Sequence, residues 1–187
     1  MVNPERNQKM DYSLNSYAKI NLFLDVISRL PNAYHEIFTI FAEIELCDKL
    51  KFFLTNKQEI KIVSNIGELN NSENLIYKVA IYLKDRFCVD KGVLVELEKN
   101  IPIAAGLGGG SSNAAATIKA LSILWDLNLS LDEMNNIAAL FGSDINFFLT
   151  GGTSIGRNRG EIIESIDDII INHILLINPN IQISSKT

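Results

Sequence analysis

The chain contains 187 residues, of which 47% are hydrophobic and 21% are charged, and its formal net charge is −5. This length predicts one domain, or one and a part, with enough apolar residues for a sizeable core. The acidic balance, without any basic cluster, argues against a nucleic-acid-binding surface. The two cysteines, Cys47 and Cys88, have neither metal-ligand nor disulfide spacing, which is typical of a protein in a reducing cytoplasm.

The sequence predicts no signal peptide and no membrane span. Residues 1–16 lack the apolar centre that a signal peptide requires. The most apolar later stretch, IIINHILLI (169–177), is interrupted by Asn172 and His173, and it predicts a buried strand rather than a span. We therefore expect a cytoplasmic protein that does not bind membranes.

Strands and helices are predicted to alternate along the chain. Residues 16–28 alternate between apolar and polar side chains, so Ala18, Ile20, Leu22, Leu24 and Val26 are expected on the core face and Lys19 and Asn21 on the other. Further strands are predicted at residues 36–46, 51–55, 59–64, 92–99 and 173–179. Helices are predicted from a Ser72 cap to about residue 87, at residues 112–125, and from a capping box of Ser130 and Glu133 to Gly142.

The stretch PIAAGLGGGSSNAAA (102–116) connects a predicted strand to a predicted helix and carries four glycines between Gly106 and Gly110. Glycines let main-chain N–H groups converge, and the first turn of a helix adds unpaired donors and a positive dipole end. Together these features predict an anion cradle suited to phosphates. A plain turn that packs helix on strand needs one or two glycines, and the spacing matches neither a Walker A loop nor the dinucleotide fingerprint.

This stretch resembles the second signature of the GHMP kinases. Three other segments resemble motifs of that superfamily and occur in the family order: AKINLFLDV (18–26), AYHEI (33–37) and FGSDINFFLTGGTSIGRNRGE (141–161). The form GLGGGSSNAA is similar to members that phosphorylate a cytidine-diphosphate-linked methylerythritol in non-mevalonate isoprenoid biosynthesis. The resemblance implies an α+β fold, with an amino-terminal domain like domain 2 of ribosomal protein S5 and only the start of the carboxy-terminal domain.

The resemblance also implies domain bounds. Residues 1–160 are expected to form the amino-terminal ATP-binding domain, with 1–15 as a candidate disordered leader. Residues 161–187 are expected to begin a truncated second domain. The strand near residues 173–179 would then be poorly covered, and its apolar surface would favour association, including a homo-oligomer.

The implied reaction transfers the γ-phosphate of ATP to the 2-hydroxyl of the substrate. By the resemblance, Asp144 accepts or orients the hydroxyl proton and Lys19 stabilises the transferring phosphoryl group, while Asn21, Tyr34 and His35 bind the substrate. Mg²⁺ is expected with ATP, and Ser112 is a candidate ligand by proximity alone. The residues implied in ATP binding are Lys99, Pro102, Ala104, Ala105, Gly106, Leu107, Gly108, Gly109, Gly110, Ser111 and Ser112. Ala104 stands where the family often has glycine.

Other interpretations remain open. Taken singly, Lys19 reads as a solvated strand end, Asp144 as a helix cap, and Tyr34 and His35 as ordinary turn residues. The chain could instead be another GHMP kinase that acts on a different small alcohol, although a Tyr-His pair suited to cytidine favours the first reading. It could also be a truncated, inactive nucleotide-binding fragment.

Overall fold

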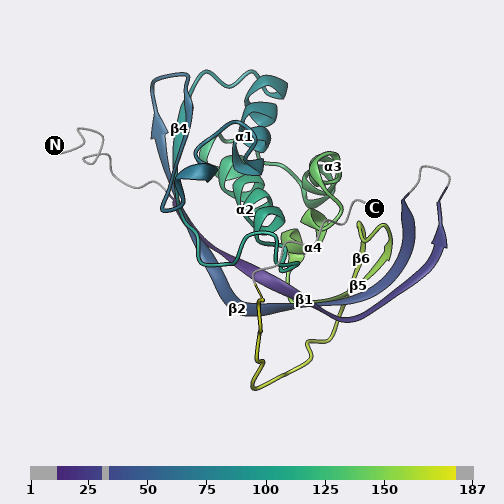
Figure 1. The fold of residues 1–187 in the computed structure, drawn as a ribbon. Coiled ribbons are helices and arrows are strands. Elements are labelled where there is room, and N and C mark those ends of the chain that lie inside the picture. The colour runs from purple at the N-terminus through teal and green to yellow at the C-terminus, as the bar shows by residue number, and fades with distance from the viewer. Residues whose placement is uncertain (1–11, 31–33, 180–187) are drawn as a thin grey trace.

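The computed structural model describes residues 12–30 and 34–179, and Figure 1 shows them as a curved sheet with the helices packed on one side. The strands are β1 (Tyr12–Arg29), β2 (His35–Thr55), β3 (Ile60–Ser64), β4 (Gly92–Glu98), β5 (Thr153–Asn158) and β6 (Ile162–Ile166). The helices are the short 3₁₀ turn η2 (Gly67–Leu69), α1 (Leu75–Arg86), α2 (Gly109–Leu124), α3 (Leu131–Phe141) and α4 (Ile145–Thr150). This arrangement confirms the predicted α+β class.

β2 is the strand around which the sheet is built. The described strands form a six-stranded sheet in the order β3-β4-β2-β5-β6, with β1 paired to β2. Along its other edge, β2 pairs with β4 over Lys49–Thr55 and with β5 over Ile37–Ala42. The β3–β4 pair is parallel, whereas β1–β2, β2–β4, β2–β5 and β5–β6 are antiparallel. β2 therefore joins the β3–β4 part of the sheet to the β5–β6 part.

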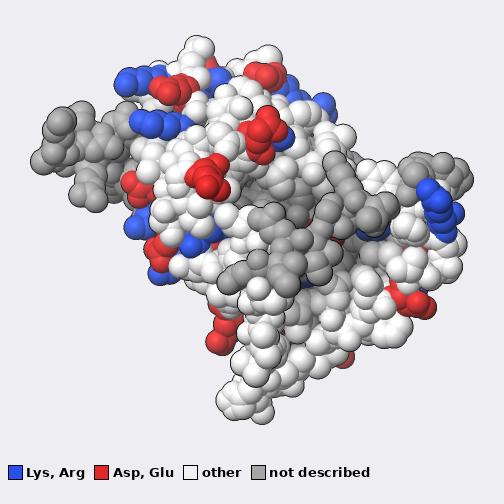
Figure 2. Space-filling model, in the orientation of Figure 1, with Lys and Arg blue, Asp and Glu red and all other residues white. Residues whose placement is uncertain are grey.

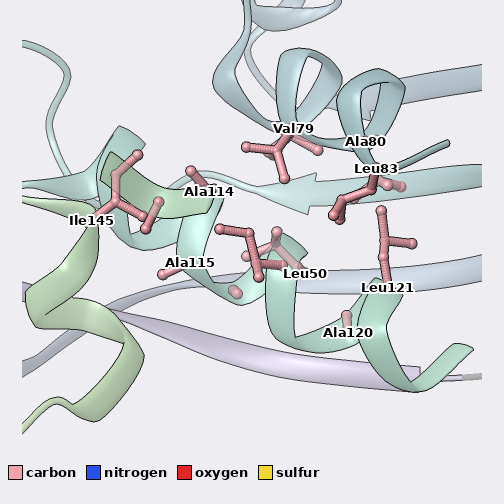
Figure 3. Packing of buried hydrophobic residues seen from close by; sticks show 14 of the residues in the cluster. Leu50, Val79, Ala80, Leu83, Ala114, Ala115, Ala120, Leu121 and Ile145 are labelled. Carbon is pink, nitrogen blue, oxygen red and sulfur yellow. The ribbon is translucent and has the colours of Figure 1, made fainter. Parts of the chain in front are cut away.

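The core lies between α1, α2 and the β2–β4–β3 part of the sheet. Figure 3 shows Leu83 of α1 next to Leu121 of α2, and Val79 of α1 directed toward the layer that holds Leu50 of β2. α2 contributes alanines to this layer, so its backbone can approach the neighbouring elements closely. The close approach fixes the start of α2, which follows the glycine-rich loop.

Two predicted helix starts need correction. α1 is capped by Asn74, whose side chain accepts the N–H of Ile76, and not by Ser72. α2 begins at Gly109 and not at Ser112, so the last glycines of the loop form the first helical turn. Glycine has a low helix propensity, which is why the sequence placed this boundary too late. The capping box of Ser130 and Glu133 is present as predicted.

The two predicted strands 36–46 and 51–55 are one continuous strand. The polar residues between them suggested a connection, but they lie within β2. Asp48 is fully buried and hydrogen-bonded, while Lys49 is exposed and pairs with Glu98 of β4. A polar residue can occupy a central strand when its partners are supplied by the fold.

The predicted core face of residues 16–28 is only half right. Ala18 is buried, but Leu22, Leu24 and Val26 are exposed. The alternation is broken by register shifts between Asn21 and Phe23 and again beyond Val26. In addition, Figure 1 shows that the β1–β2 hairpin continues past the helices as a curved arm.

The predicted strand at residues 173–179 is absent, because this segment pairs with no described strand. Its exposure is as expected: Leu175 is 84% exposed and Ile177 is 81% exposed. The segment forms the uncharged lobe at the bottom of Figure 2, whereas charges of both signs are mixed over the rest of that face.

The predicted domain limits meet the structure at two points. Residues 12–15, placed in the candidate disordered leader, belong to β1, while 1–11 lie outside the described residues. The boundary after residue 160 falls between β5 and β6, which pair with each other, so the sheet continues to Ile166. The division into two domains remains a prediction. In the described part, no helix has the length and apolar character to cross a membrane.

We expect the segment 169–177 to drive association of the chain. Replacing Leu175 and Ile177 together with aspartate should shift the protein toward monomer, because it removes exposed apolar side chains and adds charge. Sedimentation velocity over a hundredfold concentration range measures this. Replacing two exposed polar residues elsewhere, Asn56 and Lys57, with serine is the control, and an unchanged association of the aspartate variant would contradict the prediction.

Candidate functional site

The glycine-rich loop is fastened to β1 by its main chain. The N–H of Lys19 donates to the carbonyl of Leu107 over 3.0 Å. Gly108 has φ +70°, and a Cβ there would lie 2.6 Å from the ring of Phe148 and 3.1 Å from Cγ of Lys19. Only glycine fits such a conformation and such a close approach. Residues distant in sequence are thereby brought to one point.

The N-terminus of α2 opens into the loop. At this terminus the N–H of Ser112 donates to the carbonyl of Gly108 (2.8 Å). The N–H groups of Gly109, Gly110 and Ser111 precede it, and such groups have no acceptor within a helix. They lie at the positive end of the helix dipole, where anions are stabilised. The backbone is strained at the loop entry, since Ala104 has φ +56° where glycine would be relaxed.

A pocket of about 310 Å³ lies over this loop. Its walls include all but one of the residues predicted to bind ATP: Lys99, Pro102, Ala104, Ala105, Gly106, Leu107, Gly108, Gly109, Gly110 and Ser111. The sequence did not point to the other lining residues, which are Leu69, Asn74, Leu75, Leu97, Ile103 and Asn113. Leu69, Leu75 and Ile103 give the pocket apolar walls beside the polar helix start. Such a pocket can hold a flat ring and its phosphates together.

Ser112 is the predicted residue that lies apart from this pocket. It is buried, and its hydroxyl is 2.6 Å from that of Ser16 on β1. The Ser16 hydroxyl also lies 2.7 Å from Oδ1 of Asn113. Ser112 and Ser16 line a separate small cavity behind α2. Ser112 therefore helps to join α2 to β1, and its role as a metal ligand remains a prediction that requires its hydroxyl to turn.

Lys19 and Asp144 face each other beside the loop. Nζ of Lys19 lies 3.6 Å from Oδ2 of Asp144, and the Lys19 side chain is 8% exposed whereas that of Asp144 is 38% exposed. The ammonium also lies 5.3 Å from the ring centroid of Phe41. Asp144 occupies the position before α4, but its side chain makes no capping hydrogen bond. The carboxylate is thus directed to the lysine and remains accessible to a ligand.

Asn21 extends this polar row along β1. Its Oδ1 accepts from Nζ of Lys19 (2.8 Å), and its Nδ2 donates to the hydroxyl of Thr39 (2.7 Å). Thr39 is fully buried and donates to the carbonyl of Phe23. The amide of Asn21 is therefore held in one orientation while the residue itself is exposed.

Tyr34 and His35 lie at the far end of the β1–β2 arm, away from the loop. Tyr34 is 56% exposed, and the guanidinium carbon of Arg159 lies 4.8 Å from its ring centroid. The next residue, Gly160, is the point where the β5–β6 turn approaches Asp144: a Cβ there would lie 3.9 Å from Oδ1 of Asp144. The turn thus connects Tyr34 to the Lys19–Asp144 pair. The sequence did not single out Arg159.

A second pair of charged residues lies at the cavity that Ser16 and Ser112 line. Glu43 and Lys119 both line it. Burial raises the pKa of the Glu43 carboxyl, although the nearby Lys119 partly opposes this, and burial lowers the pKa of the Lys119 ammonium. Lys119 Nζ donates to the carbonyl of Phe148 over 2.9 Å, so this lysine supports the residue against which Gly108 packs.

Comparison with known proteins follows the same features. The family model described as GHMP kinases N terminal domain matches residues 74–152, which include the loop and Asp144. This part of the chain thus matches the amino-terminal domain of GHMP kinases. It is 46% identical over 175 residues to a 4-diphosphocytidyl-2-C-methyl-D-erythritol kinase of Thermoanaerobacter sp. (strain X514), and this match covers 92% of the chain and 59% of the relative. The chain thus spans about three fifths of the length of the curated relatives that it matches.

Solved structures agree with this family. A crystal structure of 4-(cytidine 5'-diphospho)-2C-methyl-D-erythritol kinase superimposes with a TM-score of 0.72 at 34% identity, over 83% of this chain and 55% of that one. Mevalonate kinase of Methanococcus jannaschii superimposes with a TM-score of 0.63 at 18% identity, over 88% and 57% of the two chains. The second match concerns the fold alone. The expected fold of a GHMP kinase amino-terminal domain is therefore confirmed.

Gly108→Ala should disrupt the loop. The left-handed conformation costs an alanine about 1–2 kcal/mol, and its methyl group would also collide with Phe148. We expect a lower unfolding midpoint in urea and at least a tenfold loss of affinity for a fluorescent ATP analogue, by the scale of misplaced binding groups. Gly67→Ala is the matched control, since its Cβ would meet nothing within 4 Å and Gly67 does not line the pocket. Normal affinity in Gly108→Ala would show that the contact with Phe148 does not shape the loop.

Proposed function

We propose that this domain binds ATP and takes part in transferring its γ-phosphate to a hydroxyl of a small molecule. The observation that carries the proposal is the proximity of three features: the N-terminus of α2, the ammonium of Lys19 and the carboxylate of Asp144. The loop carbonyl of Leu107 is bonded to Lys19 itself, so the phosphate cradle and the charged pair share one rigid support.

The chemistry follows from the charges. Phosphoryl transfer needs alignment of the two reactants and stabilisation of the negative charge on the transferring group. Asp144 accepts the proton of the attacking hydroxyl, whose oxygen bonds to the γ-phosphorus while the bond to the β,γ-bridging oxygen of ATP breaks and ADP leaves. The ammonium of Lys19 lies 3.6 Å from the Asp144 carboxylate, so it is placed to attract the transferring phosphoryl group.

We propose that the adenine occupies the apolar part of the loop pocket, beside Leu69 and Leu75, and that the phosphates lie at the start of α2. The N–H groups of Gly109, Gly110 and Ser111 point toward the predicted phosphate position by the geometry of a helix start. Lys99 lines the same pocket.

We propose that the second substrate is a cytidine-diphosphate-linked polyol. The names of the relatives support this class, and so do the residues of the arm. The Tyr34 ring can stack on a pyrimidine and His35 can bond its edge. Arg159 contacts Tyr34 from the turn that approaches Asp144. Its guanidinium can attract the diphosphate that joins base and polyol. Asn21 can bind a hydroxyl next to the reacting one. This activity would belong to non-mevalonate isoprenoid synthesis in the cytoplasm.

The residues fit Mg²⁺ that arrives with ATP. Within the described residues there is no group of three or more His, Cys, Asp or Glu side chains that could hold a metal by themselves. Mg²⁺ bound to a nucleotide commonly takes one or two carboxylates in addition to phosphates and water. Asp144 is a partly exposed carboxylate at the phosphate end of the site. When bound, the ion would neutralise phosphate charge.

A panel assay tests this function. The 187-residue chain is incubated with ATP, Mg²⁺ and one candidate alcohol at a time: a cytidine-diphosphate-linked methylerythritol, mevalonate or homoserine. We expect ADP release with the cytidine compound. Release with another alcohol only would favour a different small-molecule kinase. Nucleotide binding without turnover, even when the carboxy-terminal part of a relative is supplied, would favour an inactive fragment.

Two substitutions separate binding from chemistry. Asp144→Asn and Lys19→Met should each lower turnover about 100-fold or more, the range for a lost acid-base or charge-stabilising group. The affinity for the ATP analogue should change much less for Asp144→Asn, because the loop is intact. Asp132→Asn, on the exposed first turn of α3, is the control. Turnover that survives in Asp144→Asn would remove this residue from the chemistry.

A further inference from the structure

A buried ion pair lies below the entrance to the glycine-rich loop. Asp48, in the middle of β2, is 0% exposed, and Lys99, just beyond β4, is 8% exposed. Nζ of Lys99 donates to Oδ2 of Asp48 over 2.5 Å. Removing two charges from water is unfavourable unless further hydrogen bonds satisfy them. The neighbouring hydrogen bonds show which main-chain segment this ion pair positions.

The other oxygen of Asp48 fixes the main chain that leads into the loop. Oδ1 accepts the N–H of Asn100 (2.7 Å) and the N–H of Ile101 (2.8 Å). Asn65 holds the preceding residue, since its Nδ2 donates to the Lys99 carbonyl (3.1 Å) and its Oδ1 accepts the Lys99 N–H (2.7 Å). Three successive residues are therefore positioned by side chains immediately before Pro102.

The same pair supports the start of α2. A Cβ on Gly109 would lie 2.7 Å from Nζ of Lys99 and 2.9 Å from Cγ2 of Ile101. The first turn of the helix thus rests directly on the lysine that Asp48 holds and on the residue whose amide Asp48 binds. Asp48 therefore bonds the loop entry directly at Asn100. It supports the loop exit at Gly109 indirectly, through Lys99 and Ile101.

We propose that Asp48 is a positioning residue for nucleotide binding, and that Lys99 acts through Asp48 rather than as a ligand of the phosphates. The pair keeps the loop formed before the nucleotide arrives, so less order has to be gained on binding. This inference rests on the proposed nucleotide site and adds the residues that preform it. It also reassigns Lys99, whose ammonium is committed to a buried carboxylate.

A double-mutant cycle tests the proposal. Asp48→Asn and Lys99→Met should each weaken binding of the fluorescent ATP analogue about tenfold, because each leaves a buried partner uncompensated. The double variant D48N/K99M should return to within about threefold of the parent, since an amide oxygen at position 48 still accepts both main-chain N–H groups and no unpaired charge remains. All measurements are made well below every unfolding midpoint.

Lys49→Met is the matched control. It makes the same lysine-to-methionine change at the residue that follows Asp48 on β2, but Lys49 is exposed and pairs with Glu98. Its affinity should equal that of the parent. If Lys99→Met and the double variant are equally weak, Lys99 binds the nucleotide directly and the proposal is overturned. Unchanged affinity in both single variants would also overturn it.

Hydrogen exchange provides a measurement that needs no nucleotide. Amides of residues 100–108 should exchange faster in both single variants and recover in D48N/K99M, while amides of α3 stay unchanged. If the parent binds no ATP analogue, the proposed function fails, but the exchange result still decides whether Asp48 and Lys99 order the loop. Equal exchange in the parent and the single variants contradicts that role.

Discussion

The main-chain hydrogen bond from Lys19 to Leu107 is the contact on which the site depends. It joins the first strand to a loop nearly ninety residues later, and it forms because Gly108 has no side chain to hold the two apart. Phe148 closes the gap from the other side, and the same α4 region carries Asp144. Three segments thus meet at one bond, and we expect a change in any of them to move the lysine relative to the proposed phosphate site.

Lys19 and Asp144 differ in exposure and in freedom of movement, and this difference suits their proposed chemistry. Lys19 is held by Asn21 and Asp144 and lies over the Phe41 ring, so its ammonium has little freedom. Asp144 is partly exposed and makes no capping bond, so it can approach a ligand. A fixed cation stabilises developing charge without rearrangement during the reaction. An accessible carboxylate can receive a proton from a substrate that arrives from solvent.

The sequence predicted the parts whose signals are local. The glycine-rich stretch at the start of α2, the capping box at Ser130 and the fold class all depend on residue type and spacing. The family resemblance supplied the pairing of Lys19 with Asp144. Asp48 was missed because a buried carboxylate and a loop carboxylate look the same in sequence, and only the fold shows which amides reach it. The exposed arm was misjudged because alternation shows two faces but not whether anything covers them.

The curved arm gives a physical reason to favour a long substrate over a short alcohol. Tyr34 precedes β2, and Phe41 of the same strand lies below Lys19. At about 3.3 Å per residue, the strand separates them by roughly 20 Å, somewhat less across its concave side. Homoserine or mevalonate cannot reach from one point to the other, whereas a nucleoside diphosphate linked to a polyol can. Arg159 lies between the two points, where such a ligand carries its negative charge. In the proposed reaction the strand would act as a spacer, because the length of the ligand, as well as its base, would decide whether its hydroxyl reaches Asp144.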